Sequence, residues 1–245
     1  MKSLKNFIMV CAALSIITVS CSKDDNNDSS KGSITSEGNL SGSISHGDTL
    51  GSTVDTVVCT LDNGSSVVVG KSALKEGKFD IKLNVPATGL LNPIKTEIFP
   101  TSHPVIENIS DSTVLISESD GVFFDTYKNN TYTGNLWRAN MDINELSDYS
   151  AGEAVAFYIY SNGAVVLKAN DTDEDGIIYQ YDLSLNKGWN EIIWKCTKAN
   201  SSEVRISVTS NNEPGGMKWI FIPKDYEGKS VLQSNALLRV MQPIR

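Results

Sequence analysis

One stretch of the sequence decides the fold class: residues 78–86 read KFDIKLNVP. Apolar and polar residues alternate along its whole length, and this period of two is typical of a β-strand with one buried face. The residues on the apolar face are Phe79, Ile81, Leu83 and Val85. Because the proline that follows has no backbone N–H to donate, the strand is predicted to end there.

Asn-Gly pairs predict tight hairpins at two places. The pair at residues 63–64 separates the apolar runs at 54–61 and 67–69, and the pair at 162–163 follows the run at 154–160. Both central residues of a type I′ turn need positive φ, which Asn and Gly adopt at low cost. We therefore expect each pair to join two antiparallel strands.

Further short apolar runs fill the second half of the chain, each bounded by turn-forming residues. They lie at residues 177–185, 191–197, 203–209 and 217–222. Short strands at such spacing indicate a sandwich or barrel. The sequence thus predicts an all-β protein with an antiparallel β-sandwich architecture.

Two sandwich-like domains are expected, with a single continuous domain as the alternative. Residues 100–112 contain two prolines and little periodicity, which favours a boundary there or at 118–121. The predicted domains are an N-terminal β-sandwich at 33–116 and an aromatic-rich antiparallel β domain at 117–245. The Gly-Lys-Phe that opens the alternating strand resembles small sandwich modules related to transthyretin and to carboxypeptidase regulatory domains, which implies that type of fold for 33–116.

The N-terminus has the pattern of an export signal. Lys2 and Lys5 precede an apolar or small run at residues 7–19, too short for a membrane-spanning helix of about 20 residues. Cys21 follows, and then a polar stretch without apolar residues. This resembles a bacterial lipoprotein signal, which implies that residues 1–20 are removed and that Cys21 carries palmitate and other lipid. Residues 21–32 would then form a flexible tether to the membrane.

Two phrases resemble uncharacterised lipoproteins of Bacteroidota. The first is the Ser-Lys-Asp-Asp tail at residues 22–25, similar to export signals of surface lipoproteins in that phylum. The second is the strand and Lys-Gly-Trp-Asn turn at residues 179–190. The resemblance implies an outer-membrane lipid anchor, with the protein at the cell surface or facing the periplasm, and it implies no activity.

Charge and motif content argue against several functions. The net charge of −8 without a Lys/Arg cluster opposes nucleic-acid binding. His46 and His103 stand alone, with no other ligand at metal-binding spacing, and no nucleophile elbow or phosphate loop is present. We therefore expect no enzyme activity and no cofactor. A hydrolase stays open as an alternative, because catalytic carboxylates meet only in the fold.

Cys59 and Cys196 are the two cysteines outside the signal and its lipid site. Both lie in apolar, strand-like runs. We expect buried free thiols, with a disulfide between them as the alternative.

An acidic loop at residues 171–176 resembles the start of a calcium loop. Asp171, Asp173 and Asp175 alternate and Gly176 stands at the turn position. In an extended strand, however, Asp182 would lie about 20 Å from the loop, too far to complete the cage. A solvated hairpin turn is the expected structure, and a weak cation site at the three aspartates is the alternative.

Aromatic residues near loops form the predicted ligand face. They are Trp137, Trp189, Tyr127, Tyr132 and Tyr149. Aromatic surfaces suit the apolar faces of sugar rings. Trp194 and Trp219 lie within apolar strands instead, and we expect them in the core.

The sequence leaves three functions to compare. The first is a non-catalytic binding module for a glycan or a macromolecule. The second is a structural or accessory subunit of an envelope or fimbria-like assembly, with an envelope protein as partner. The third is the hydrolase.

Overall fold

The computed structural model describes residues 34–62, 65–99, 104–141, 150–210 and 212–225. Cys21 and Tyr149 lie outside them. The strands are β1 (Asn39–Ser43), β2 (Thr56–Asp62), β3 (Ser66–Ala73), β4 (Lys78–Lys82), β5 (Asn92–Pro93), β6 (Val105–Ile109), β7 (Leu115–Ile116), β8 (Phe123–Lys128), β9 (Thr131–Ala139), β10 (Ala154–Ser161), β11 (Val165–Thr172), β12 (Ile178–Leu185), β13 (Gly188–Asn200), β14 (Glu203–Ser210) and β15 (Lys218–Pro223). The helices are short: η1 (Gly47–Ser52), η2 (Thr88–Leu90) and α1 (Ile94–Glu97). The prediction of an all-β, sandwich-like fold is confirmed.

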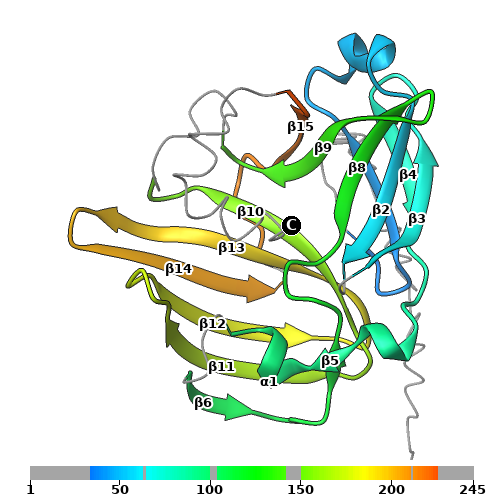
Figure 1. The fold of residues 1–245 in the computed structure, drawn as a ribbon. Coiled ribbons are helices and arrows are strands. Elements are labelled where there is room, and N and C mark those ends of the chain that lie inside the picture. Colours follow the sequence, from blue (N-terminus) through cyan, green and yellow to red (C-terminus); the bar gives the residue numbers. More distant parts are fainter. Residues whose placement is uncertain (1–33, 63–64, 100–103, 142–149, 211, 226–245) are drawn as a thin grey trace, which may run out of the picture.

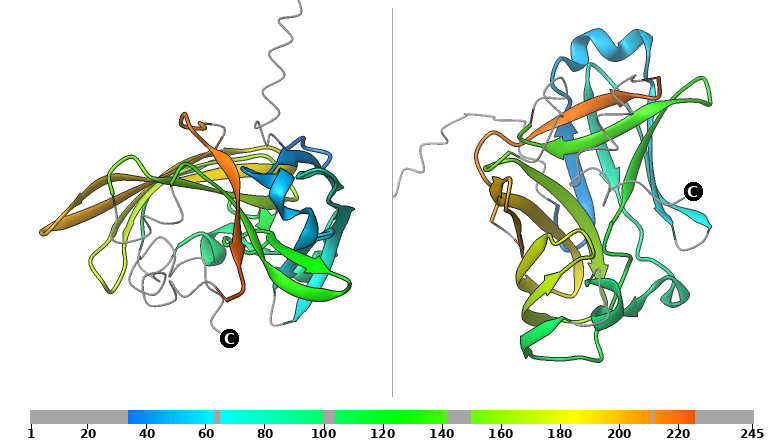
Figure 2. Two further views of the ribbon diagram at one scale, coloured as in Figure 1. Left: turned by 90° about the horizontal axis from the view of Figure 1, so that it is seen from above. Right: turned by 60° about the vertical axis from the view of Figure 1, so that its left-hand side comes forward.

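Within the described residues the strands form one 13-stranded sheet and one two-stranded sheet, β1–β4. The large sheet runs in the order β3-β2-β8-β9-β10-β13-β14-β12-β11-β6, with β15 beside β9 and the β5–β7 pair beside β10. β12 and β14 are parallel, and the other strand pairs are antiparallel. The blue and cyan strands β1 to β4 lie at one end of the molecule and the yellow strands β11 and β12 at the other (Figure 1, Figure 2).

The predicted boundary at residue 116 does not divide the hydrogen bonding. β2, from the first range, pairs with β8 from the second, and β6 pairs with β11. The described residues form two hydrophobic cores, and each core takes residues from both ranges. The first core joins Ile94 and Ile116 to β10–β14, and the second joins Phe79 to Trp219.

β10 and β13 separate the two cores. Every residue of β10 is buried. Val155, Phe157 and Ile159 face the first core, whereas the alternate residues, among them Tyr158 and Tyr160, face the second. Because side chains alternate across a strand, a strand without exposed residues must be covered on both sides.

The second core is surrounded by the ring of strands β1-β4-β3-β2-β8-β9-β15. Strand pairing closes most of this ring. Two backbone hydrogen bonds complete it, from Asn84 N to Val69 O (2.7 Å) and from Ser45 N to Trp219 O (2.8 Å). The small sheet is thereby fixed to the large one at both of its edges.

Glycines in and before β1 allow this strand to lie against two buried indoles. A Cβ on Gly42 would lie 2.5 Å from Nε1 of Trp219, and one on Gly38 would lie 2.7 Å from Cδ1 of Trp189. Both distances are far below van der Waals contact. Only glycine therefore permits the observed approach of β1 to the second core.

Most strands match the runs seen in the sequence. The alternating stretch forms β4 and its extension, with Phe79, Ile81 and Leu83 buried, but Val85 is 68% exposed because regular pairing ends at Lys82. The first predicted hairpin is confirmed, since β2 pairs with β3.

The second predicted hairpin is wrong. β10 pairs with β13, β9 and β7, so neither of its edges is left for β11. Asn162 instead bonds to β7: its N–H donates to Leu115 O (3.0 Å) and its side-chain oxygen accepts from Leu115 N (2.9 Å).

The two cysteines are buried and unbridged, as expected. Cys59 belongs to the second core and Cys196 to the first. β10 and β13 thus stand between them.

Candidate ligand face

Three of the predicted ligand residues lie on neighbouring strands. Tyr127 on β8 is the direct cross-strand partner of Tyr132 on β9, and their ring centroids are 5.9 Å apart in an edge-to-face arrangement. Trp137 lies further along β9 and is partly buried against the first core. All three side chains keep part of their surface accessible.

A bulge in β9 brings these residues to the same face. The register shifts between Thr126 and Tyr127, so Thr133 is left without a direct partner. With a strict period of two, Tyr132 would point away from Asn135 and Trp137. The extra residue reverses this, and the Tyr132 hydroxyl is hydrogen-bonded to the side-chain amide of Asn135.

The resulting surface, which we call the β8–β9 face, combines aromatic and polar side chains. Its members are Phe123, Asp125, Tyr127, Tyr132, Asn135 and Trp137, all partly exposed. The alternate residues of β8 and β9, such as Phe124 and Leu136, are buried in the second core. Asp125 and Asn135 are cross-strand partners, and the Asn135 side-chain nitrogen donates to Asp125 Oδ1 at 3.3 Å.

A small pocket opens at one end of this face, where β9 and β10 separate. The two strands pair at only two positions, Ala139–Val155 and Arg138–Ala156. Beyond them β9 stays with β8 and β15, whereas β10 follows β13. The cavity between them, the β9–β10 pocket, has a volume of about 30 Å³, enough for about two water molecules.

The wall of the β9–β10 pocket combines aromatic residues with aliphatic and polar ones. It includes Phe123 and Trp137 of the β8–β9 face, Phe157 of β10, and Trp219 of β15. Asp120 supplies a carboxyl group to the same wall. The pocket and the β8–β9 face are therefore continuous.

Three carboxyl groups near the pocket have raised pKa values. Burial raises the pKa of Asp120 to about 6, and the Glu97 carboxylate adds to this effect. Burial also raises the pKa of Glu118 to about 7, with contributions from Glu97, Asp120 and Asp62. The pKa of Glu97 is raised by burial and partly restored by a hydrogen bond with Asn92. Asp120 is the most buried of the three, and the negative charges of the group repel one another.

The basic group in the pocket wall is already paired. The buried guanidinium of Arg138 lies 3.6 Å (Nε) from Glu191 Oε1 and also donates to Glu213 Oε1. Tyr158 donates its hydroxyl proton to Glu191 at 3.1 Å. Burial raises the pKa of Glu191 to about 7, although Arg138 and Tyr158 act in the opposite direction. The charge of Arg138 is thus compensated inside the protein.

Trp189 does not belong to the ligand face, so this prediction is wrong. Its side chain is 2% exposed, and its ring meets Tyr160 edge-to-face at 5.6 Å in the second core. Residues 36–38 cover the Trp189 ring, and the backbone N–H of Trp189 donates to Ser36 O. The turn glycine before Trp189 suggested exposure, but a distant segment of chain packs over it. Trp194 and Trp219 are buried, as expected.

The acidic loop forms the turn between β11 and β12, as predicted. The Asp173 carboxylate accepts hydrogen bonds from the N–H groups of Asp175 and Ile177 and from the Tyr179 hydroxyl. Asp171 is buried and accepts from the N–H of Thr172. Asp173 therefore stabilises the turn itself. In the part of the chain that the structure describes, no group of three or more acidic, histidine or cysteine residues is arranged to hold a metal ion.

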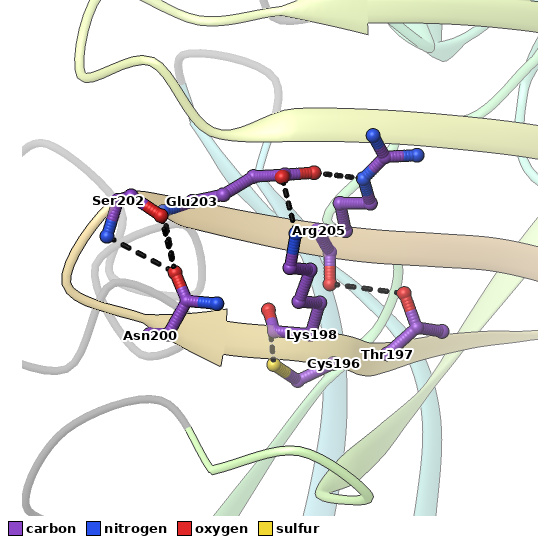
Figure 3. A network of polar contacts seen from close by, with 7 residues as sticks. All are labelled: Cys196, Thr197, Lys198, Asn200, Ser202, Glu203 and Arg205. Atoms are coloured by element: carbon purple, nitrogen blue, oxygen red, sulfur yellow. Dashed lines mark hydrogen bonds and ion pairs between the residues drawn. The ribbon is translucent and has the colours of Figure 1, made fainter.

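A second polar network stabilises the tip of the β13–β14 hairpin. The Glu203 carboxylate accepts from Lys198 and from Arg205, and Asn200 accepts from the N–H groups of Ser202 and Glu203 (Figure 3). Lys198 and Arg205 thus both pair with the Glu203 carboxylate. This network accounts for the hairpin rather than for a ligand.

Comparison with protein-family models, with curated proteins and with solved structures found no match. Among the residues described, no helix is long and apolar enough to cross a membrane. The geometry of the β8–β9 face and its pocket therefore carries the functional argument alone.

Sequence reasoning missed Phe123, Asp125, Asn135 and Asp120. The first three alternate with core residues along β8 and β9, and a period-of-two reading of those strands could have found them. Asp120 lies in a short connection before β8, and only the fold brings it to the pocket wall.

Proposed function

We propose that the protein is a non-catalytic glycan-binding module, exported and held at the outer membrane by lipid on Cys21. The observation that carries the binding part is the β8–β9 face, where accessible aromatic rings alternate with an amide and a carboxylate. A sugar ring has an apolar face and a rim of hydroxyl groups. Aromatic side chains match the former, and Asp125 and Asn135 match the latter.

The arrangement suits an elongated ligand. The Tyr127–Tyr132 pair lies at one end of the β8–β9 face and Trp137 at the other, beside the pocket. Asp125 and Asn135 lie between these two aromatic groups. A chain of two or more sugar units could thus stack at both ends and form hydrogen bonds in the middle.

The anchor is proposed from the sequence around Cys21. Replacement Cys21→Ala should move the protein from the membrane fraction to the soluble exported fraction and abolish labelling with palmitate. Wild-type protein that resists palmitate labelling would rule the anchor out, without bearing on the ligand face.

The glycan is tested by probing an array of oligosaccharides with the purified protein. We expect the wild type to retain at least one class of glycan, and Tyr127→Ala and Trp137→Ala to lose it. Because loss of one stacked ring removes about 1–3 kcal/mol of binding free energy, each variant should bind about 5- to 150-fold more weakly. Val166→Ala is the matched control, because Val166 is exposed on β11 and belongs to neither the face nor the pocket. The proposal is contradicted if the wild type binds no oligosaccharide on the array. It is also contradicted if the wild type and the three variants bind equally.

A hydrolase is the second candidate, and the carboxyl groups beside the pocket favour it. Asp120 and Glu118 have pKa values of about 6 and about 7, which suit a general acid near neutral pH. If this candidate is correct, a retained oligosaccharide is cleaved over hours and Asp120→Asn or Glu118→Gln stops the cleavage. If the ligand is still intact after prolonged incubation with wild-type protein, the hydrolase is ruled out and the binding module remains.

A further inference from the structure

The β9–β10 pocket places a largely buried carboxyl group, that of Asp120, beside aromatic rings. Phe123, Trp137 and Phe157 present aromatic surface to the cavity, and Asp120 presents a carboxyl group. We propose that this pocket receives an ammonium group, and that the ligand of the β8–β9 face is a glycan carrying a free amine. The inference rests on the proposed function and specifies its ligand.

Aromatic walls favour a cation. The face of an aromatic ring carries partial negative charge, so an ammonium within about 6 Å of the ring centre is attracted, and more strongly where water is excluded. Aromatic cages recognise quaternary ammonium groups by the same attraction, which also acts on a primary ammonium. One carboxylate beside the rings adds a charged hydrogen-bond acceptor.

The size of the pocket selects a small group. With a volume of about 30 Å³ it accommodates an ammonium with its attached carbon but no sugar ring. The ring must therefore remain outside, where the β8–β9 face begins at Phe123 and Trp137. This division matches an amino sugar whose ring stacks on the face while its amine enters the pocket.

The surrounding charges exclude an anionic ligand. Arg138 is ion-paired with Glu213 and also lies beside Glu191, so its charge is already used inside the protein and is not offered to a carboxylate or phosphate. Glu118 and Glu97 lie close enough to Asp120 to raise pKa values in the group. A bound ammonium would relieve this mutual repulsion, whereas an anion would increase it.

The direct test uses methylammonium as the probe. Purified protein is titrated with methylammonium chloride, with sodium chloride at equal ionic strength as the control, and the four tryptophan indole N–H resonances are followed by NMR. We expect a saturable shift of the Trp137 resonance with methylammonium and none with sodium. The Trp189 resonance is the internal control, because Trp189 packs against Tyr160 in the second core and neither residue lines the pocket. Asp120→Asn should weaken the binding about tenfold. Absence of a saturable shift at Trp137, or equal affinity in Asp120→Asn, overturns the inference.

A second measurement separates this inference from the proposed function. Three β-1,4-linked oligosaccharides of equal length are compared, with a hydroxyl, an N-acetyl or a free amine at carbon 2 of each unit. We expect the free amine to bind at least tenfold more tightly than the other two, and Asp120→Asn to reduce this ratio to about one. If all three oligosaccharides bind with equal affinity, the inference of an ammonium pocket is wrong, whereas the proposed glycan-binding function still holds. If methylammonium shifts the Trp137 resonance but no glycan binds in this comparison or on the array, the ammonium pocket is supported and the proposed glycan-binding function is wrong.

Discussion

Replacement of Asp120 with asparagine changes the charge of the pocket wall while nearly preserving its shape. Burial, assisted by Glu97, raises the pKa of this carboxyl from 3.8 to about 6 in the folded protein. Ionisation is therefore harder in the folded than in the unfolded state. As the pH rises from about 4 to about 7, Asp120 loses its proton and the free energy of unfolding falls.

The expected effect follows from the two pKa values. A rise from 3.8 to about 6 corresponds to about 3 kcal/mol. Asparagine carries no ionisable group, so Asp120→Asn should be about 3 kcal/mol more stable than the wild type at pH 7.5. At pH 4, where the folded carboxyl is already protonated, the difference should shrink to about 0.5 kcal/mol.

Urea unfolding at the two pH values, followed by tryptophan fluorescence, measures both differences. Asp111→Asn is a control of opposite sign. Hydrogen bonds from the Thr113 hydroxyl and N–H lower the pKa of Asp111, so its ionised form stabilises the fold. This variant should be less stable than the wild type at pH 7.5, with the loss fading as the pH falls. If Asp120→Asn is no more stable than the wild type at pH 7.5, or if its gain persists at pH 4, the pocket wall is better solvated than described and the reasoning fails.

Two further predictions concern the fold and the acidic turn. Gly42→Ala should destabilise the protein by about 1–3 kcal/mol, because its Cβ would lie 2.5 Å from Trp219 Nε1. Gly89→Ala is the control: nothing lies within 4 Å of its Cβ, and a loss as large as that of Gly42→Ala would refute the packing of β1. Asp173→Ala should cost about 1–2 kcal/mol, because the carboxylate accepts from the N–H of Ile177 and from the Tyr179 hydroxyl. Millimolar calcium should leave the wild-type melting temperature unchanged, and a calcium-dependent rise that disappears in Asp173→Ala would show that the turn binds the ion.

Local patterns in the sequence were sufficient to find most strands. Alternation predicted β4, a short apolar run between turn residues predicted β12, and the Asn-Gly pair at residues 63–64 predicted the β2–β3 hairpin. In each of these cases the local pattern is decided by neighbouring residues, through the side-chain period or the turn propensity of Asn and Gly.

The order of the strands depended on information that local patterns do not carry. The Asn-Gly pair at 162–163 looks like a hairpin, yet β10 pairs with β13, about 30 residues away, and β11 pairs with β12. The buried run of β10 is equally consistent with a hairpin strand and with a central strand covered on both faces. Only the choice between long-range partners distinguishes them.

The candidate site could be found only in part. Tyr127, Tyr132 and Trp137 were recognised as loop-proximal aromatics, but the bulge at Thr133 that aligns them has no signature in the sequence. Trp189 looked similar and is covered by residues 36–38, which are distant in the chain. The exposure of an aromatic residue is decided by such long-range packing, so the sequence could not separate the two cases.

Mapping a retained glycan onto the backbone tests the central claim most directly. In an NMR titration of the wild-type protein with an oligosaccharide selected on the array, we predict that the largest amide shifts cluster on β8 and β9 around Tyr127, Tyr132 and Trp137. The polar surface of β11, β12 and β14 should remain unshifted. Shifts that cluster on those three strands instead, or an oligosaccharide that moves no resonance of β8 and β9, would contradict the β8–β9 face as the ligand site.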